Sequence, residues 1–212
     1  MAETTVVHLL RHGEVHNPGG ILYGRLPGYH LSEAGRLMAD TVAKAVGGRD
    51  IVALYSSPLE RAMETAAPLA DQLGLEIRQD VRLIEAGNLL EGRTSGNGSA
   101  LFRDWRNYRY FWNPLRPSWG ESYLGIVQRM RSMIDDARAV VRGHEAVLVS
   151  HQLPIWAIRM AAEGRRLWHD PRRRQCALAS LTTFTFDGDR LVSIGYSEPA
   201  GSIDAGPSVP GA

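Results

Sequence analysis

Short apolar runs alternate along the chain with longer segments whose apolar residues recur every three or four positions. The apolar, β-branched runs predict buried strands at residues 4–10, 50–57, 75–80 and 144–150. The periodic segments predict helices at residues 31–46, 57–74, 121–141 and 152–164. Residues 177–197 have the pattern of a β-hairpin, with Asp187-Gly188 at the expected turn.

Polar, proline and glycine residues mark where these helices should begin and end. Ser32 is the expected N-cap of the first helix, and Gly47-Gly48 should stop it. The second helix is expected to begin with Ser57 as N-cap and Pro58 at its first position. Pro68 lies inside the same segment and predicts a kink or a break there.

The order of the elements indicates the fold class. Strands that alternate with helices are typical of a mainly parallel sheet, because parallel neighbours need a crossover connection. We therefore predict an α/β fold of three layers, with helices on both faces of the sheet and a late antiparallel addition. One domain should span residues 1–198, with residues 86–120 inserted as a lid over one edge. Residues 199–212 are small, polar and rich in Gly and Pro, so we expect a disordered tail.

The composition is that of a globular protein without a strong electrostatic field. The chain has 212 residues, of which 44% are hydrophobic and 22% are charged, and its net charge is +1. A charge so near zero argues against nucleic acid or an anionic membrane as the partner. The single cysteine, Cys176, excludes an internal disulfide and a cysteine-based zinc cluster. No apolar run approaches ~20 residues and no basic-then-apolar leader is apparent, so we expect a cytoplasmic protein.

Polar residues of one kind follow three of the predicted strands. The first strand ends in Arg11-His12, the second leads into a helix that carries Arg61, and the strand at 144–150 is followed by His151. The carboxyl ends of parallel strands lie along one edge of the sheet, where α/β proteins bind their ligands. Two histidines and two arginines should therefore meet in one crevice, beside two helix N-termini that attract anions.

This set of residues suits phosphoryl transfer. A neutral imidazole is a nucleophile near pH 7 and can accept a phosphoryl group, while guanidinium groups hold the phosphoryl oxygens. The leaving oxygen needs a proton, so an acid should face the nucleophile. Glu85, directly after the third strand, is the expected proton donor.

Several motifs, taken together, resemble those of the histidine phosphatase superfamily, the phosphoglycerate mutase-like group. They are LLRHGE, SSPLERAMETA, the glutamate of LIEAGNLLEG, WGES and VLVSHQ, in this order over roughly residues 5–160. The resemblance implies that His12 is the phosphorylated nucleophile. It implies that Arg11, Arg61 and His151 bind the phosphoryl group, and that Glu85 donates the proton and then activates water. It also implies a reaction that needs no metal and no organic cofactor.

The chain departs from the family pattern at three points. The family commonly has an asparagine or similar residue six positions after the nucleophile, whereas Asn17 follows five positions after it. We expect Asn17 to bind phosphate despite this spacing. Gln152 follows the second histidine where glycine is usual, which should alter the floor of the pocket. The segment from Glu85 to Glu91-Gly92 is one residue shorter than is common, which leaves Glu91 as a second candidate for the acid.

Other residues have plainer explanations. HGEVH resembles a zinc-binding HExxH motif, but its glutamate is misplaced and Gly13 disfavours the required helix, so no metal site is predicted. Arg25 lies in a loop expected beside the nucleophile, where it either binds substrate or is a plain surface residue. The aromatic and basic residues at 102–112 could stack on nucleic-acid bases, but a lid is favoured. The basic segment at 165–174 is most simply a solvated turn.

We therefore predict a metal-independent phosphomonoester hydrolase that acts through a phosphohistidine on His12. Two alternatives stay open: a phosphoglycerate mutase, which returns the phosphoryl group to another hydroxyl, and a phospho-ligand binding module without catalysis. The chain is shorter than typical mutases of this family and shows no equivalent of their extra loop segment, which favours hydrolysis. The expected partner is a small phosphomonoester that the sequence does not identify. Exposed aromatic residues leave a homodimer open.

Overall fold

A six-stranded sheet forms the centre of the computed structural model, which describes residues 3–93 and 120–204. The strands stand in the order β3-β2-β4-β1-β5-β6. Their bounds are β1 (Thr4–Arg11), β2 (Ile51–Ser56), β3 (Ile77–Gln79), β4 (Glu145–Ser150), β5 (Leu181–Asp187) and β6 (Arg190–Ser197). The first four are parallel, whereas β5 is antiparallel to β1 and β6 is antiparallel to β5.

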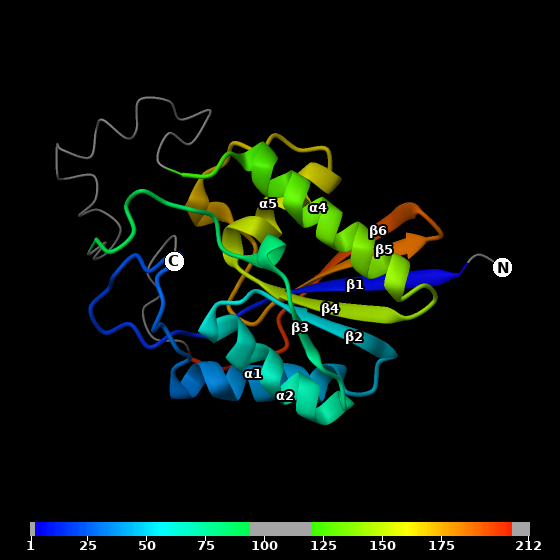
Figure 1. The fold of residues 1–212 in the computed structure, drawn as a ribbon, viewed down its shortest axis with the longest axis horizontal. Helices are drawn as coiled ribbons and strands as arrows, with labels where there is room; N and C mark the ends of the chain where they lie inside the picture. The colour runs from blue at the N-terminus through cyan, green and yellow to red at the C-terminus, as the bar shows by residue number, and fades with distance from the viewer. Residues whose placement is uncertain (1–2, 94–119, 205–212) are drawn as a thin grey trace.

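Helices cover both faces of this sheet (Figure 1). One face packs against α1 (Glu33–Val46) and α2 (Glu60–Leu73), and the other against α4 (Tyr123–Val140) and α5 (Gln152–Ala162). Two short 3-10 helices lie in connections, η1 (Val81–Leu83) and η3 (Pro171–Arg173). The three-layer α/β fold predicted from the order of elements is confirmed.

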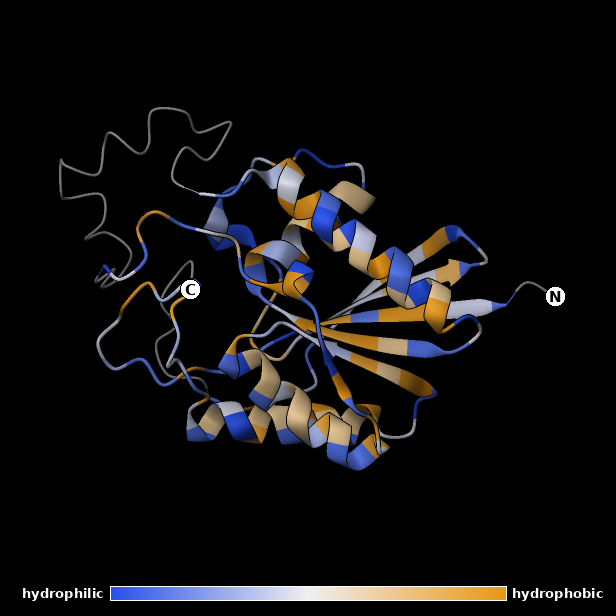
Figure 2. Cartoon of the chain, in the orientation of Figure 1, coloured by the Kyte–Doolittle hydropathy of each residue, from blue (hydrophilic) through white to orange (hydrophobic). Residues whose placement is uncertain are grey.

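Alternate side chains of the strands enter two separate cores. In β1, Leu9 packs toward α4 and α5, Leu10 packs toward α1 and α2, and both are fully buried. Figure 2 shows the apolar residues concentrated in the strands and on helix faces that meet them. Burial on both faces explains why the strands read as continuous apolar runs in the sequence.

The two N-terminal helices begin differently from one another. Ser32 caps α1 as predicted, because its side chain accepts a hydrogen bond from the Gly35 amide. The prediction for α2 was wrong by two residues: the helix begins at Glu60, and Leu59 is the N-cap. Ser57 instead directly follows β2, and its amide donates to the carbonyl of Val149 on β4. Pro68 is accommodated within a continuous α2, so the predicted break does not occur.

The ends of the described chain bear on the domain boundaries. Gly188 and Asp189 connect β5 to β6, so the predicted hairpin is present, with its turn one residue later than the expected Asp187-Gly188. Ala200 is buried and Ile203 packs against the core, so ordered structure continues past the boundary expected at residue 198. Most of the expected lid, residues 94–119, and the tail from residue 205 lie outside the described residues. In the part of the chain that is described, no helix is long and apolar enough to cross a bilayer.

Candidate active site

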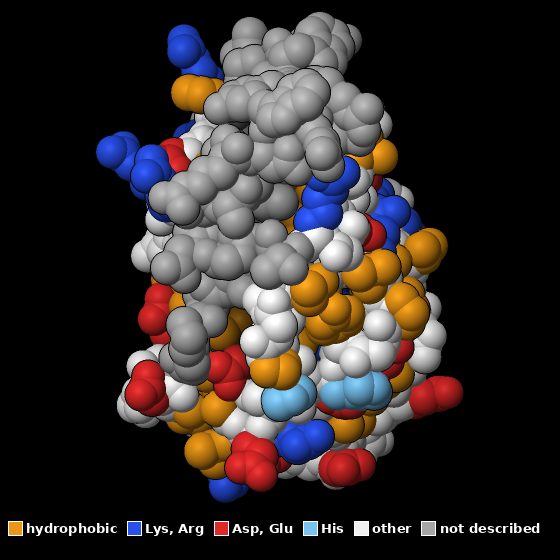
Figure 3. Space-filling view, turned by 90° about the vertical axis from the view of Figure 1, so that its left-hand side faces the viewer, with side chains coloured by type: hydrophobic (Ala, Val, Ile, Leu, Met, Phe, Trp, Pro, Cys, Tyr) orange, Lys and Arg blue, Asp and Glu red, His pale blue; other side chains and the backbone are white. Residues whose placement is uncertain are grey.

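The carboxyl ends of β1, β2 and β4 bring the predicted site residues to one edge of the sheet. Arg11 at the end of β1 pairs with Ser150 at the end of β4, so His12 and His151 leave adjacent strands at the same level. Figure 3 looks onto this end of the molecule, where basic and apolar side chains are interspersed beside residues that are not described. The convergence of these residues was predicted from the order of the strands.

His12 is fully buried and has one nitrogen without a partner. Its Nδ1 lies 2.8 Å from the carbonyl oxygen of Gly13, which assigns the ring proton to Nδ1. Nε2 is buried and makes no hydrogen bond to any described residue. Burial, followed by the charges of Arg61 and Arg11, holds the pKa of His12 well below its usual value. The imidazole is therefore neutral near pH 7, with the Nε2 lone pair available for attack.

Gly13 is required for the chain to pass close to α1. A Cβ at this position would lie 2.6 Å from the carbonyl oxygen of Gly35, a distance that side chains do not tolerate. The Gly13 amide is held by the hydroxyl of Thr65 on α2 at 3.0 Å. The glycine after the histidine thus lets the nucleophile lie against both helices on this face.

His151 faces His12 across the site. The two ring centroids are 5.1 Å apart, and both rings are completely buried. The Ser57 hydroxyl lies 2.8 Å from Nε2 of His151, while Nδ1 has no hydrogen-bond partner among the described residues. With the Ser57 hydroxyl as donor to Nε2, the imidazole carries its proton on Nδ1, where that proton can bind a phosphoryl oxygen. Burial and the charge of Arg61 hold the pKa of His151 well below its usual value, so it too is neutral.

Arg61 supplies buried donors to the same space. Its Nη2 donates to the carbonyl of Gly24, and its guanidinium lies over the ring of Tyr23 at 4.7 Å. Its Nε and Nη1 are buried without a hydrogen bond to any described residue. Arg11 enters from β1 and donates from Nη1 to the carbonyl of Cys176 at 2.7 Å. The two guanidinium groups and the two histidines form a cluster fitted to an anion with several oxygens.

Glu85 is the carboxyl group of this cluster. Its side chain is buried, and Oε1 accepts a hydrogen bond from the Ala86 amide at 2.7 Å. Burial raises the pKa of Glu85 and outweighs the opposing effects of the Ala86 amide and of nearby arginines. A raised pKa favours the protonated acid, the form that can donate to a leaving oxygen.

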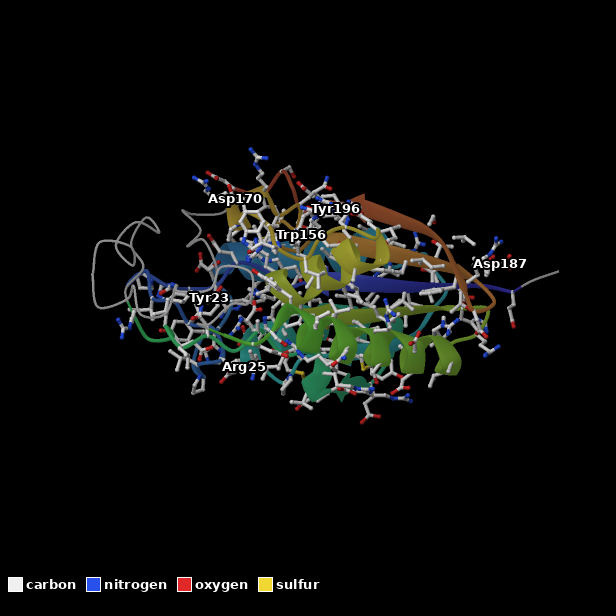
Figure 4. The ribbon with its side chains drawn as sticks, turned by 90° about the horizontal axis from the view of Figure 1, so that it is seen from above. Tyr23, Arg25, Trp156, Asp170, Asp187 and Tyr196 are labelled. Carbon is white, nitrogen blue, oxygen red and sulfur yellow. The ribbon has the colours of Figure 1, made fainter. Side chains whose placement is uncertain are left out.

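An ion-pair network fixes the segment that presents Glu85. Glu121 accepts hydrogen bonds from Arg25 Nη2 and from Arg129 Nε, each at 2.8 Å. Arg25 also donates to the carbonyl of Glu85 at 2.7 Å, and Arg129 donates to the carbonyl of Arg82 at 2.6 Å. Both arginines thus hold the backbone of residues 82–85. Figure 4 shows Arg25 at the same end of the molecule as Tyr23, while Asp187 lies at the other end.

Two further candidates lie outside the cluster. Asn17 was expected to bind phosphate, but its amide is engaged on both atoms with the backbone of Ile21, at 2.8 and 3.0 Å. It closes the turn at residues 17–21 in this structure. Glu91, the second candidate for the acid, accepts from the amide of Asn88 at 3.2 Å and so stabilises its own turn. Glu85 is the carboxylate that shares the electrostatic environment of Arg61 and Arg11.

Several residues of the site were missed in the sequence. Ser57 precedes Pro58, a sequence typical of a helix start, so nothing in the sequence indicated the contact between Ser57 and His151. Tyr23 belongs to a loop expected beside the nucleophile, but nothing indicated that its ring lies against Arg61. Arg174 was assigned to a solvated turn, yet it is partly buried and its charge acts on Glu85. Glu121 was noted only as part of the WGES motif.

The described residues form no cluster that resembles a metal site. Residues 12–16 are not helical, so the spacing in HGEVH does not place two histidines on one helix face. Within residues 3–93 and 120–204, no group of three His, Cys, Asp or Glu side chains is arranged to hold a metal ion.

Comparisons with known proteins agree with this arrangement. The chain is 56% identical over 200 residues to an uncharacterized protein of Mycobacterium tuberculosis, covering 94% of this chain and 99% of that one. It is 30% identical over 184 residues to a probable phosphoglycerate mutase of Yersinia pestis, covering 82% and 83%. The structure of a mycobacterial glucosyl-3-phosphoglycerate phosphatase superposes with a TM-score of 0.71 at 28% identity, covering 86% and 90%. The profile of the histidine phosphatase superfamily, branch 1, matches residues 7–198, and the chain belongs to this superfamily.

Proposed function

We propose that this protein is a metal-independent phosphomonoesterase that acts through a phosphohistidine on His12. One observation carries the proposal: four buried nitrogen atoms without described partners lie in one cluster. They are Nε2 of His12, Nδ1 of His151, and Nε and Nη1 of Arg61. Buried polar atoms are normally paired, so a set of unpaired ones in one place indicates a ligand that completes them. A phosphoryl group offers three oxygens to the donors and an electrophilic phosphorus to the lone pair of His12.

The first step transfers the phosphoryl group to the enzyme. Nε2 of His12 attacks phosphorus as the ester P–O bond breaks, and Glu85 gives its proton to the leaving oxygen, so an alcohol departs. Arg61, Arg11 and the Nδ1 proton of His151 bind the phosphoryl oxygens as charge develops. The Gly13 carbonyl, which accepts from Nδ1 of His12, stabilises the positive ring of the phosphohistidine.

The second step releases phosphate. Glu85, now a carboxylate, takes a proton from water, and the water oxygen attacks phosphorus as the N–P bond breaks. Inorganic phosphate leaves, Glu85 is protonated again and His12 returns to its neutral form. No metal ion or organic cofactor takes part in this sequence.

A phosphoglycerate mutase is the second candidate, because a relative with that name is similar over most of both chains. A mutase uses the same first step but returns the phosphoryl group to a hydroxyl of the substrate. The cytoplasmic location expected from the sequence remains a prediction, and so does a homodimer, which the sequence left open.

The first experiment measures release of phosphate from p-nitrophenyl phosphate in the presence of EDTA. The parent chain should be active, and His12→Ala should lose essentially all turnover. A trapped acid-labile phosphoryl group on the parent, absent in His12→Ala, would identify the intermediate. Undiminished turnover by His12→Ala would contradict the phosphohistidine mechanism. Interconversion of 3- and 2-phosphoglycerate without net phosphate release would indicate the mutase.

A further inference from the structure

Arg174 brings another positive charge to the edge of the site. Its Nε lies 2.9 Å from Nε2 of His169, and its Nη1 donates to Oε1 of Gln152 at 3.2 Å. These contacts fix the guanidinium beside the cluster, where its charge acts on Glu85 and Arg11. A basic segment that looked like a solvated turn therefore directs one of its arginines inward.

No carboxylate of the described residues neutralises this guanidinium within 4 Å. His169 is a neutral acceptor, because its Nδ1 donates to the carbonyl of Leu167 at 2.7 Å and its Nε2 accepts from Arg174. Gln152 is neutral as well. A partly buried cation held only by neutral groups retains capacity for an anion, since pairing with one offsets the loss of water. Its Nη2 makes no hydrogen bond to a described residue and is the donor left for that purpose.

Gln152 links Arg174 to the catalytic cluster. It follows His151 directly and stands where glycine is usual in the family. Its side chain accepts from Arg174 and approaches the Cys176 carbonyl, which also accepts from Arg11. The departure noted in the sequence is thus what holds the additional arginine in place.

A cavity of about 410 Å³ extends from Arg11 past this arginine. Arg174, Gln152 and Cys176 line it, with apolar contributions from Met38, Leu178 and Ile203 and one carboxylate, that of Glu198. Figure 4 shows Tyr196, a further lining residue, nearer the middle of the molecule, between Tyr23 and Asp187 along its length. Arg11, which holds the transferred phosphoryl group in the mechanism above, and Arg174 line this same space, so one bound molecule can contact both guanidinium groups.

We propose that Arg174 binds a second anionic group of the substrate, a carboxylate or a second phosphate, carried by the alcohol that leaves. The proposal rests on the phosphomonoesterase function above and specifies its substrate class. Arg11 and Arg61 are occupied by the transferred phosphoryl group, so among the described residues of this cavity Arg174 is the cation left for another anion. Arg174 and Arg11 line the same cavity and are linked through Gln152 and the Cys176 carbonyl, so the second anion lies on the leaving group and close to the ester.

The test compares paired substrates that differ in the second anion. The carboxylate pair is 3-phosphoglycerate and glycerol 3-phosphate, and the phosphate pair is ethylene glycol bisphosphate and ethylene glycol monophosphate, in which the second phosphate is two carbons from the ester. We expect the parent to prefer the member that carries the second anionic group in at least one pair. Arg174→Gln should lower kcat/KM for that member about 10- to 100-fold, the usual effect of losing a charge-assisted hydrogen bond. The member without the second anionic group should change less than about threefold, and Arg174→Lys should recover part of the loss because it retains the charge.

Arg173→Gln is the matched control, because it removes the same charge from the adjacent, exposed position. It should behave as the parent does. Equal losses on both members of a pair would overturn the proposal, because they would mean that Arg174 acts through the fold or through Glu85. Unchanged discrimination in both pairs would overturn it as well.

Binding separates this inference from the proposed function. In an inactive His12→Ala background, calorimetric titration measures the affinity for each member of the pairs without turnover. Adding Arg174→Gln should lower the affinity by the same factor only for the ligand that carries the second anionic group. This result would establish the anion subsite even if the parent hydrolysed none of the four compounds. No difference in affinity would overturn the subsite while leaving the phosphohistidine mechanism intact.

Discussion

The protonation states of His12 and Glu85 follow from the same burial. Loss of water disfavours the charged form of any group, so it lowers the pKa of a histidine and raises that of a carboxylic acid. The arginines lower both pKa values, but burial is the larger effect on Glu85. The free enzyme therefore holds a neutral nucleophile and favours a protonated acid, which is the combination that the first step requires.

The role of Glu85 is tested by leaving-group dependence. Glu85→Gln should slow hydrolysis of an alkyl phosphate by about 100- to 10,000-fold, because an alkoxide needs the proton. It should lower kcat/KM for p-nitrophenyl phosphate much less, because nitrophenolate leaves without a proton and kcat/KM does not include the later step in which Glu85 activates water. The fall in kcat/KM at rising pH, which reports ionisation of Glu85 above its usual pKa, should disappear in the variant. Steady-state kinetics on both substrates from pH 4.5 to 8.5 measure these effects.

Glu91→Gln is the control for that experiment, since Glu91 is the other acid of the same segment. Its carboxylate stabilises a turn and does not share the environment of His12. The variant should keep the pH profile and the leaving-group dependence of the parent. If Glu91→Gln instead lost activity on alkyl phosphates while Glu85→Gln kept it, the acid would be Glu91.

Whether a site residue could be predicted from the sequence depends on whether a local pattern or a contact between distant segments positions it. The strand ends that carry His12 and His151 were predictable, because strand periodicity and parallel topology place them at one edge. The inward turn of Arg174 was not, because it depends on hydrogen bonds to His169 and to Gln152 on a different element. Ser57 was misassigned because the same Ser-Pro sequence suits a helix start. Local patterns thus predict elements, while contacts between distant segments determine which side chains enter the site.

The ion-pair network around Glu121 shows how a residue just before a helix can position an acid on another segment. Glu121 lies just before α4 and draws together Arg25 and Arg129, both of which hold carbonyl groups at residues 82–85. Its side chain is about one-quarter exposed, so the ion pairs themselves add little to stability. Their geometric effect is the more important one.

Glu121→Gln should therefore affect catalysis more than folding. We expect kcat on an alkyl phosphate to fall about 3- to 30-fold, since small displacements of a proton donor are costly. The alkaline limb of the pH profile should move, because the environment of Glu85 changes. The free energy of unfolding should fall by no more than about 1 kcal/mol. Kinetics against pH and urea unfolding measure the two effects.

Glu163→Gln is a closely matched control at the end of α5. Glu163 also bridges two arginines, Arg159 and Arg165, and its side chain is 25% exposed against 24% for Glu121. It makes no hydrogen bond to residues 82–85. Equal kinetic effects of the two substitutions would argue against a positioning role for Glu121.

At the scale of the whole molecule, burial of histidines, including the two of the site, lowers the free energy of unfolding at acidic pH. Three buried histidines, His8, His12 and His151, have pKa values below the usual one, chiefly because of burial. Below pH 6.5 the unfolded chain binds protons at these residues before the folded chain does. The free energy of unfolding must then fall as the pH falls, with a slope of up to about 1.4 kcal/mol per pH unit for each histidine.

Glu85 has the opposite effect on this slope. Because its pKa is raised on folding, the folded chain retains a proton there that the unfolded chain loses above pH 4.5. Between pH 6.5 and pH 5.5, the proton retained on Glu85 offsets the effect of at most one of the three histidines on the free energy of unfolding. The depressed pKa values of Asp80, Glu145 and Glu163 affect stability only at lower pH. Acid destabilisation in this window should therefore come from the histidines.

Urea unfolding of the parent between pH 8 and pH 5.5 should show stability that is flat above pH 7 and falls below it. His12→Asn should reduce the slope by up to one proton, because it removes one histidine that stays neutral in the fold. His16→Asn, at an exposed position a few residues away, should leave the slope unchanged. A slope equal in the parent and His12→Asn would mean that His12 is protonated in the folded chain. It would then lack the lone pair that nucleophilic attack requires, so the same titration tests both the stability argument and the chemistry.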